Sequence, residues 1–212
     1  MFQVAILQFM IYSKGRLAGT LLFVAVTQFI LCLIIAEALY PGYSVSDNYI
    51  SDLGIGPSSI IFNSSTFLLG VLLILGTYLQ RQISDFKTLN IFLLLMAVGS
   101  MGVGVFTKDF RISHGVVSST AFFFAGLSAM ASSKVLERPF SLISTVLGVM
   151  TLGALVLFSS GLIASGSLTS DYAYDSIFFL GLGPGGMERM IIYPALTWLA
   201  GFSGYLLTRQ ET

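Results

Sequence analysis

Residues 17–39, LAGTLLFVAVTQFILCLIIAEAL, form a run of 23 residues in which Glu37 is the only charged side chain. A helix needs about 20 apolar residues to cross the roughly 30 Å hydrocarbon core of a bilayer. This run therefore predicts a transmembrane helix. Five more runs of the same kind follow, at residues 58–79, 89–106, 114–133, 140–164 and 188–207.

The composition supports a membrane protein built from these runs. Hydrophobic residues make up 55% of the chain and charged residues 9%, whereas soluble domains carry about 25% charged residues. The mean hydropathy is +0.89. Strands of a membrane barrel are alternating segments of about ten residues, and these runs are longer and continuously apolar. We predict an all-α, polytopic bundle of six transmembrane helices that forms one domain over residues 1–212.

The first residues, Met1 to Tyr12, are apolar, but the basic residues Lys14 and Arg16 follow this segment. A cleavable signal peptide has its basic residues in front of the apolar segment. We expect an interfacial N-terminal anchor here rather than a seventh span.

Lysine and arginine in the short loops indicate the orientation, because they collect on the cytoplasmic side. With the N-terminus inside, seven basic residues are cytoplasmic: Lys14, Arg16, Arg81, Lys87, Lys134, Arg138 and Arg209. Three are outside: Lys108, Arg111 and Arg189. This asymmetry predicts a multi-pass protein of the cell membrane with both termini in the cytoplasm.

Most acidic residues fall on the opposite, outer side. They are Glu37, Asp47, Asp52, Asp109, Asp171, Asp175 and Glu188. The single histidine, His114, falls there too. Carboxylates in an outer loop also serve simply to solvate the surface, and Asp47, Asp171 and Asp175 fit that interpretation equally well. The concentration of ionisable groups nevertheless predicts a polar, acidic pocket at the outer membrane face.

Asp52 has two interpretations. It precedes Gly54, Gly56 and Pro57, a pattern typical of a helix start, and a carboxylate near a helix N-terminus can cap backbone N–H groups. The neighbouring Ser51 favours a functional pocket instead. In that case Asp52, Ser51 and His114 are the candidate catalytic residues.

The remaining candidate residues are charged groups close to the membrane boundary. Such groups usually pair with one another or line a polar cavity. Asp109 and Arg111 lie within six positions of His114, and Glu188 and Arg189 follow the flexible segment GLGPGG. Glu37 approaches the outer surface from within the bundle, with Arg111 or Arg189 as a possible partner. The expected ligand-binding residues are Glu37, Asp109, Arg111, Glu188 and Arg189.

Several functions are excluded or disfavoured by the residues present. One His and one Cys rule out a polyhistidine zinc site, a thiolate cluster and an internal disulfide. P-loop, HExxH and GxSxG patterns are absent. A hard cation held by carboxylates and a Ser51 hydroxyl activated by His114 both stay open, and neither a particular cofactor nor a nucleic-acid partner is indicated. Gly99, Gly102 and Gly104 predict close helix packing.

The segments SVSDNYISDLGIGPSSIIFNSS, GVGVF with the following His114, and GGMERMIIYP resemble the prokaryotic membrane family catalogued as domain of unknown function 998. This resemblance covers nearly the whole chain. Ile50, Ser51, Asp52, Gly54 and Pro57, with His114, Ala121 and Phe122, are also distantly similar to the Frag/DRAM/Sfk group. The second resemblance covers about residues 40 to 133 and implies lipid-related work at the membrane.

Three functions are therefore considered. The first is a protein that binds or organises membrane lipids, with the headgroup held by Arg111 or Arg189. The second is a lipid-modifying hydrolase or acyl-transfer enzyme that uses Asp52 and His114. The third, a small-solute transporter, is least favoured, because the middle parts of the six runs contain almost no ionisable residues.

Overall fold

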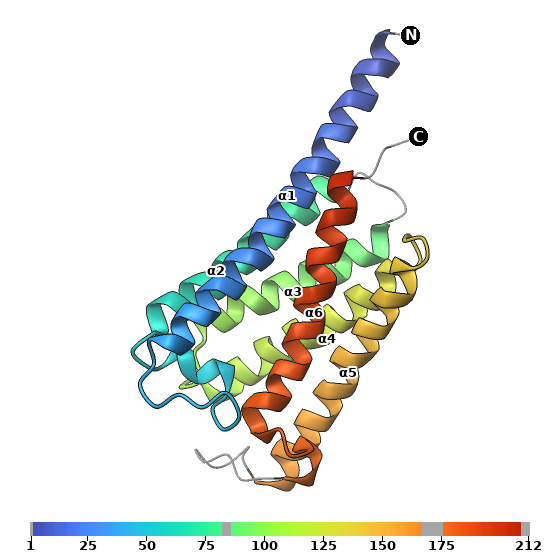
Figure 1. Cartoon of the computed structure of the whole chain (residues 1–212). Coiled ribbons are helices and arrows are strands. Elements are labelled where there is room, and N and C mark those ends of the chain that lie inside the picture. The colour runs from blue at the N-terminus through green and yellow to red at the C-terminus, as the bar shows by residue number, and fades with distance from the viewer. Residues whose placement is uncertain (1, 82–85, 167–175, 209–212) are drawn as a thin grey trace.

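The computed structural model describes residues 2–81, 86–166 and 176–208. In these ranges all the regular structure is helical. The long helices are α1 (Phe2–Ala38), α2 (Ser59–Gln80), α3 (Lys87–Val105), α4 (Arg111–Ser132), α5 (Phe140–Ala164) and α6 (Gly183–Thr208), and two short 3-10 helices are η1 (Ile50–Gly54) and η3 (Ile177–Phe179). Each long helix has a segment long and apolar enough to cross a membrane. The predicted all-α bundle of six transmembrane helices is confirmed (Figure 1).

The helices differ from the predicted runs mainly at their polar ends. Helix α4 begins at Arg111 instead of 114, and α6 begins at Gly183 instead of 188. Both predicted starts were placed at ionisable residues, His114 and Glu188, next to the apolar runs, but a helix continues past the apolar core into polar surroundings. Pro184 stands in the first turn of α6, where its missing N–H costs no helical hydrogen bond.

Helix α1 has 37 residues, which corresponds to a length of about 55 Å. This is more than the roughly 30 Å of a hydrocarbon core, and only Lys14–Ala38 counts as its membrane span. The preceding residues, expected to form a separate interfacial anchor, continue the same helix without a break and extend past the other helices (Figure 1). Lys14 and Arg16 lie inside this helix, and both residues are good helix formers.

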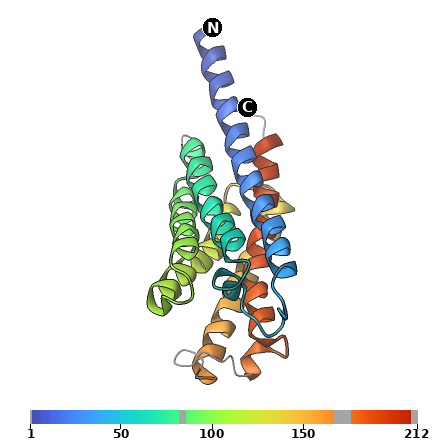
Figure 2. The same ribbon diagram turned by 90° about the vertical axis from the view of Figure 1, so that its left-hand side faces the viewer.

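The helices form a closed ring. Each long helix packs against the next one in the sequence, and α6 also packs against α1, as the side-by-side course of these two helices in Figure 2 shows. The beginning of α1 and the end of α6 lie at one end of the bundle (Figure 1). The opposite end holds η1, η3 and residues 39–58 and 106–110, and we name it the η1 end.

The interior around Trp198 is apolar and tightly packed. The side chain of Trp198 is fully buried and stacks on Phe202 with 5.6 Å between ring centroids. Its indole N–H donates to Ser132 Oγ at 2.9 Å, which joins α6 to α4. Gly99 lets α3 approach α4, because a Cβ there would lie 2.5 Å from the backbone nitrogen of Ala121. This confirms the predicted close packing at Gly99.

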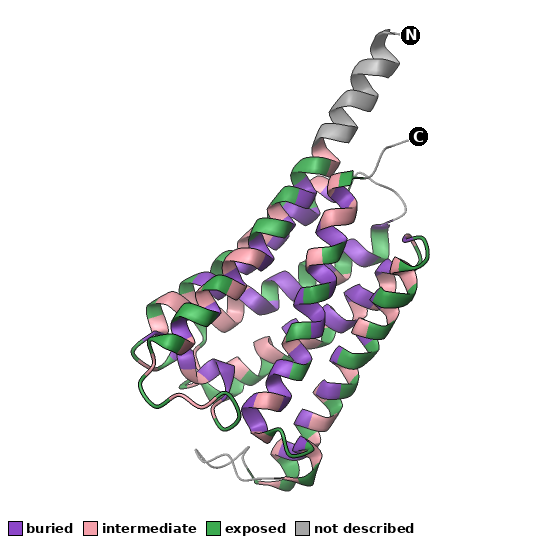
Figure 3. Ribbon diagram, in the orientation of Figure 1, coloured by how far each residue is buried: buried purple, intermediate pink, exposed green. Residues whose placement is uncertain are grey.

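The outer surface carries large apolar side chains. Ile60, Ile112 and Val156 expose 81%, 85% and 64% of their surfaces, and exposed residues follow the outward faces of the helices in Figure 3. A surface of this kind is unfavourable in water and suits contact with lipid.

Candidate functional site

Two adjoining cavities open within the η1 end. The larger, which we name the wide cavity, has a volume of about 700 Å³ and is partly polar. Its lining includes six side chains of Asp, Glu, Lys, Arg or His, which come from η1, from residues 106–110 and from the first two turns of α4 and α6. They are Asp52, Lys108, Asp109, Arg111, His114 and Glu188.

The second, which we name the narrow cavity, has a volume of about 70 Å³ and lies among α1, α2, α3, α4 and α6. Its lining is almost entirely apolar. Thr66 and Ser100 also line it, but their hydroxyls donate to the carbonyls of Phe62 and Met96 in their own helices, at 2.8 and 2.9 Å. These side chains therefore place few unsatisfied polar atoms in the cavity.

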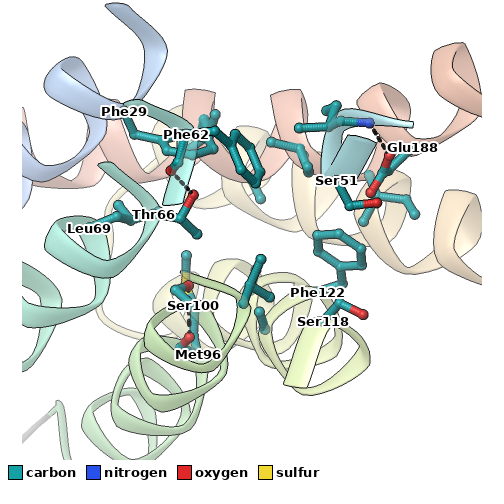
Figure 4. Close-up of a pocket in the computed structure, with 18 of the residues that line it drawn as sticks. Phe29, Ser51, Phe62, Thr66, Leu69, Met96, Ser100, Ser118, Phe122 and Glu188 are labelled. Atoms are coloured by element: carbon teal, nitrogen blue, oxygen red, sulfur yellow. Dashed lines mark hydrogen bonds between the residues drawn. The ribbon is translucent and has the colours of Figure 1, made fainter. Parts of the chain in front are cut away.

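The two cavities meet at five residues that line both of them: Ser51, His114, Ser118, Phe122 and Glu188. Figure 4 shows Ser51, Glu188, Ser118 and Phe122 on one side of the narrow cavity, and Phe29, Leu69 and Met96 on the other. The wide cavity, with its charged side chains, thus adjoins an apolar cavity that extends between the helices.

Asp52 both caps a helix and forms an ion pair. Its Oδ2 accepts a hydrogen bond from the backbone N–H of Tyr49 at 2.9 Å, which caps η1. Its Oδ1 pairs with Lys108 Nζ, and that ammonium group lies 4.4 Å from the centre of the Tyr49 ring. Of the two interpretations of Asp52, the cap therefore applies to η1, and the residue that precedes α2 is Ser58.

His114 lies in the first turn of α4. Its Nδ1 is 2.8 Å from the carbonyl oxygen of Phe106. A carbonyl only accepts, so Nδ1 carries the proton in this contact, and in the neutral ring Nε2 keeps its lone pair. The wide cavity is lined by His114 together with Ser51 and Asp52, so the three candidate catalytic residues face a common space.

Glu188 lies in the second turn of α6 and exposes 6% of its surface. Its Oε2 accepts from the backbone N–H of Ile50 at 2.6 Å, which fixes η1 to α6. Asp109 and Arg111 line the wide cavity from its exposed rim. Of the six acidic or basic candidate residues, four therefore border the wide cavity: Asp52, Asp109, Arg111 and Glu188.

Glu37 and Arg189 have a different position. They form an ion pair. Arg189 was one of the two partners considered for Glu37, the other being Arg111. Arg189 also donates to the carbonyls of Val45 and Gly185, at 2.8 and 3.0 Å, and to Tyr43 Oη at 2.8 Å. Neither Glu37 nor Arg189 lines the two cavities formed by the described residues. Their contacts hold the loop after α1 against α6.

Tyr43 extends this network toward the wide cavity. Its hydroxyl donates to the carbonyl of Tyr49 at 2.9 Å, and burial raises the pKa of the phenol above its usual range. The hydroxyl therefore stays protonated. Arg189 acts through Tyr43 on the residue next to η1, which makes it a positioning residue.

Three outer carboxylates were also interpreted as groups that only solvate the surface: Asp47, Asp171 and Asp175. Asp47 is exposed and accepts from Ser44 Oγ at 2.7 Å, and Asp171 and Asp175 lie outside the described residues. Within the described ranges, no group of three or more His, Cys, Asp and Glu side chains is arranged to hold a metal ion.

Lys108 and the narrow cavity were missed in the sequence. In the sequence analysis Lys108 served only to indicate the orientation in the membrane, although it is the neighbour of Asp109 in the segment that leads to His114. The narrow cavity has a signal in α4, where His114, Ser118, Ala121 and Ala125 recur at helical spacing and line it together. Small residues on one helical face fit close packing equally well, so spacing alone does not distinguish a cavity.

A family model described as "Protein of unknown function (DUF998)" matches residues 23–204. The chain belongs to the DUF998 family. This confirms the first of the two resemblances, and the DUF998 match includes every residue of both cavities. Neither the curated proteins nor the solved structures contain a match to the chain. The DUF998 assignment and the six spans make this an integral, multi-pass membrane protein.

Proposed function

We propose that the protein binds a membrane lipid, with the polar headgroup in the wide cavity and an alkyl chain in the narrow cavity. The observation that supports this is the junction at Ser51, His114, Ser118, Phe122 and Glu188, where a charged space of about 700 Å³ adjoins an apolar one. An amphiphile has the same division into a polar and an apolar part. Ligand sites are generally concave and largely apolar, with a few polar groups that fix orientation.

The wide cavity has charges of both signs. Asp52, Asp109 and Glu188 are acidic, and Lys108 and Arg111 are basic. The predicted acidic pocket thus becomes a mixed one, because Lys108 neutralises Asp52. In this proposal Arg111, at the rim, contacts the anionic part of a headgroup.

The proposed route of entry is from the bilayer, between α4 and α5. Near residues 133–139 these helices touch closely, since a Cβ on Gly148 would lie 2.7 Å from the carbonyl oxygen of Gly126. Toward the η1 end they separate (Figure 1), and Phe122 of α4 and Phe158 of α5 both line the wide cavity. A lipid between these helices keeps its chains in an apolar environment while the headgroup enters.

Among the described residues, Lys and Arg are more numerous toward the other end of the bundle than at the η1 end, six against three. This excess supports an orientation with the η1 end on the outer side of the cell membrane. The distant similarity of Ile50, Ser51, Asp52 and His114 to the Frag/DRAM/Sfk group adds support for lipid-related work.

Native mass spectrometry of the detergent-purified protein tests lipid binding. The wild type should retain co-purifying lipid, and Ala125→Leu should reduce retention, because Ala125 lines the narrow cavity and exposes 4% of its surface. Ala164→Leu is the matched control, since Ala164 is exposed at the end of α5. Equal retention by both variants would refute a chain in the narrow cavity, and a lipid-free wild type under mild extraction would refute the proposal itself.

A lipid-modifying enzyme is the second candidate, and the orientation of His114 favours it. With Nδ1–H held by Phe106, Nε2 is available as a general base, and Ser51 lines the same cavity. General-base catalysis needs these two side chains within hydrogen-bond reach or one water in the substrate complex. Ser51→Ala and His114→Ala should then abolish conversion of a supplied lipid while its binding persists, and unchanged lipid masses with the wild type would exclude the enzyme.

A further inference from the structure

Glu188 is a buried carboxylate at the border of a polar and an apolar space. It exposes 6% of its surface and lines both cavities. Within the described part of the chain, its Oε2 accepts a hydrogen bond from the neutral backbone N–H of Ile50, at 2.6 Å. Figure 4 shows the side chain beside Ser51 at the edge of the narrow cavity.

The other carboxylates of this region are compensated or exposed. Asp52 pairs with Lys108 and Glu37 with Arg189, and Asp109 is exposed. Among the described residues, no Lys, Arg or His nitrogen lies within 4.0 Å of the Glu188 carboxylate. A carboxylate removed from water without an opposite charge is costly, so a positively charged ligand group gains by binding here.

The sequence neighbour Arg189 does not supply that charge. Its guanidinium donates to Glu37, Tyr43 and the carbonyls of Val45 and Gly185. Lys108 is held between Asp52 and the Tyr49 ring. Arg189 and Lys108 are therefore both engaged by other partners.

We propose that Glu188 binds an ammonium group located at the root of the ligand's alkyl chain, as in a long-chain amine. This inference rests on the proposed lipid binding and specifies that the ligand carries a positive charge at the root of its alkyl chain. From Glu188 the narrow cavity continues past Ile191 and Ile192 to Leu196, eight residues along α6 or about 12 Å. A chain in that space places its first polar atoms beside Glu188.

The same position disfavours amphiphiles whose anionic group lies at the root of the alkyl chain. A fatty acid bound with its chain in the narrow cavity would bring its carboxylate next to Glu188, and two like charges at one site oppose each other's ionisation. A neutral alcohol would fill the apolar space but leave the charge of Glu188 uncompensated. The expected order of binding is amine, then alcohol, then carboxylate.

Dodecylamine, dodecanol and dodecanoate, which share a chain length, test this order when supplied together at equal concentration to the detergent-solubilised protein. Because the amine and the alcohol have nearly the same mass, the alcohol is supplied in perdeuterated form, and native mass spectrometry then separates the three bound forms by mass. The wild type should prefer the amine over the alcohol. Glu188→Gln should lower the ratio of bound amine to bound alcohol about tenfold, which corresponds to one charge-assisted hydrogen bond, while the amide oxygen can still accept from Ile50.

Glu188→Asp should keep a preference for the amine, because it keeps the charge. Glu137→Gln is the control, with the same chemical change at an exposed site near the other end of the bundle, and should bind like the wild type. A wild type without amine preference, or a folded Glu188→Gln protein with an unchanged ratio, overturns the inference. If the alcohol still binds and Ala125→Leu blocks it, lipid binding stands without the charge assignment. If no probe binds, both proposals fail.

Discussion

Replacement of Asp52 by asparagine separates its two roles. An asparagine side chain can still accept the hydrogen bond from the Tyr49 N–H, because Asn caps about as well as Asp. It loses the charge that pairs with Lys108. Asp52→Ala loses both interactions, so the pair of variants isolates the cap from the charge.

The expected changes in unfolding free energy follow from the exposure of the partners. The side chain of Lys108 is 31% exposed and that of Asp52 13%, so the ion pair is close to the surface class, which contributes about 0 to 1 kcal/mol. The cap contributes about 1 kcal/mol. Asp52→Asn should therefore cost at most about 1 kcal/mol, and Asp52→Ala should cost about 1 kcal/mol more.

Unfolding of the detergent-solubilised variants by increasing SDS, followed by circular dichroism, measures these differences. Lipid retention is measured on the same preparations by native mass spectrometry. Asp52→Asn should fold nearly normally and lose most of its lipid, because the cavity loses a carboxylate and Lys108 loses its partner. Asp47→Asn, at an exposed carboxylate outside both cavities, is the control.

Two results would refute this reasoning. Equal destabilisation by Asp52→Asn and Asp52→Ala would show that the cap contributes nothing. Full retention of both stability and lipid by Asp52→Asn would remove Asp52 from the binding site. A double-mutant cycle with Lys108→Gln should give a coupling of about 0.5 kcal/mol if the ion pair matters.

Three further predictions concern orientation, loop positioning and packing. With Cys32 replaced by serine, Asp47→Cys should react with a membrane-impermeant maleimide in intact cells, and reaction only after lysis would reverse the topology. Arg189→Met should lower the free energy of unfolding by about 3 kcal/mol, because it removes the hydrogen bonds of a buried guanidinium and leaves the half-buried Glu37 without its partner. A change below about 0.5 kcal/mol in the SDS assay would contradict a structural network. Gly99→Ala should cost about 1 to 3 kcal/mol through overpacking, whereas Gly153→Ala, with open space around its Cβ, should be neutral or slightly stabilising; similar melting temperatures for these two would refute the packing argument.

Much of the site could be predicted, but only as a group of residues. Charges that flank apolar runs are readily recognised, and Asp52, Asp109, Arg111, His114 and Glu188 do border one cavity. The contacts that define Glu188 and the ion pair of Asp52 are with partners more than 50 positions away. Glu188 contacts Ile50, 138 positions earlier, and Lys108 contacts Asp52, 56 positions earlier. No local pattern encodes such pairs.

The separation of Glu188 from Arg189 shows the same limit. The two are adjacent in the sequence and both follow GLGPGG, which suggests a shared function. Adjacent residues of a helix point about 100° apart. In the bundle, Arg189 is directed to the loop after α1, while Glu188 reaches the junction of the cavities.

The sequence alone determined the number of helices and their approximate bounds, because a bilayer requires every backbone polar group to be paired within its segment, and long apolar runs satisfy that requirement only as helices. The tertiary structure decided which charges compensate one another and where space is left between the helices. Those features depend on the distances between side chains of different helices, and the local hydrophobic pattern does not contain these distances. The narrow cavity and the uncompensated carboxylate of Glu188 therefore became visible only in the folded bundle.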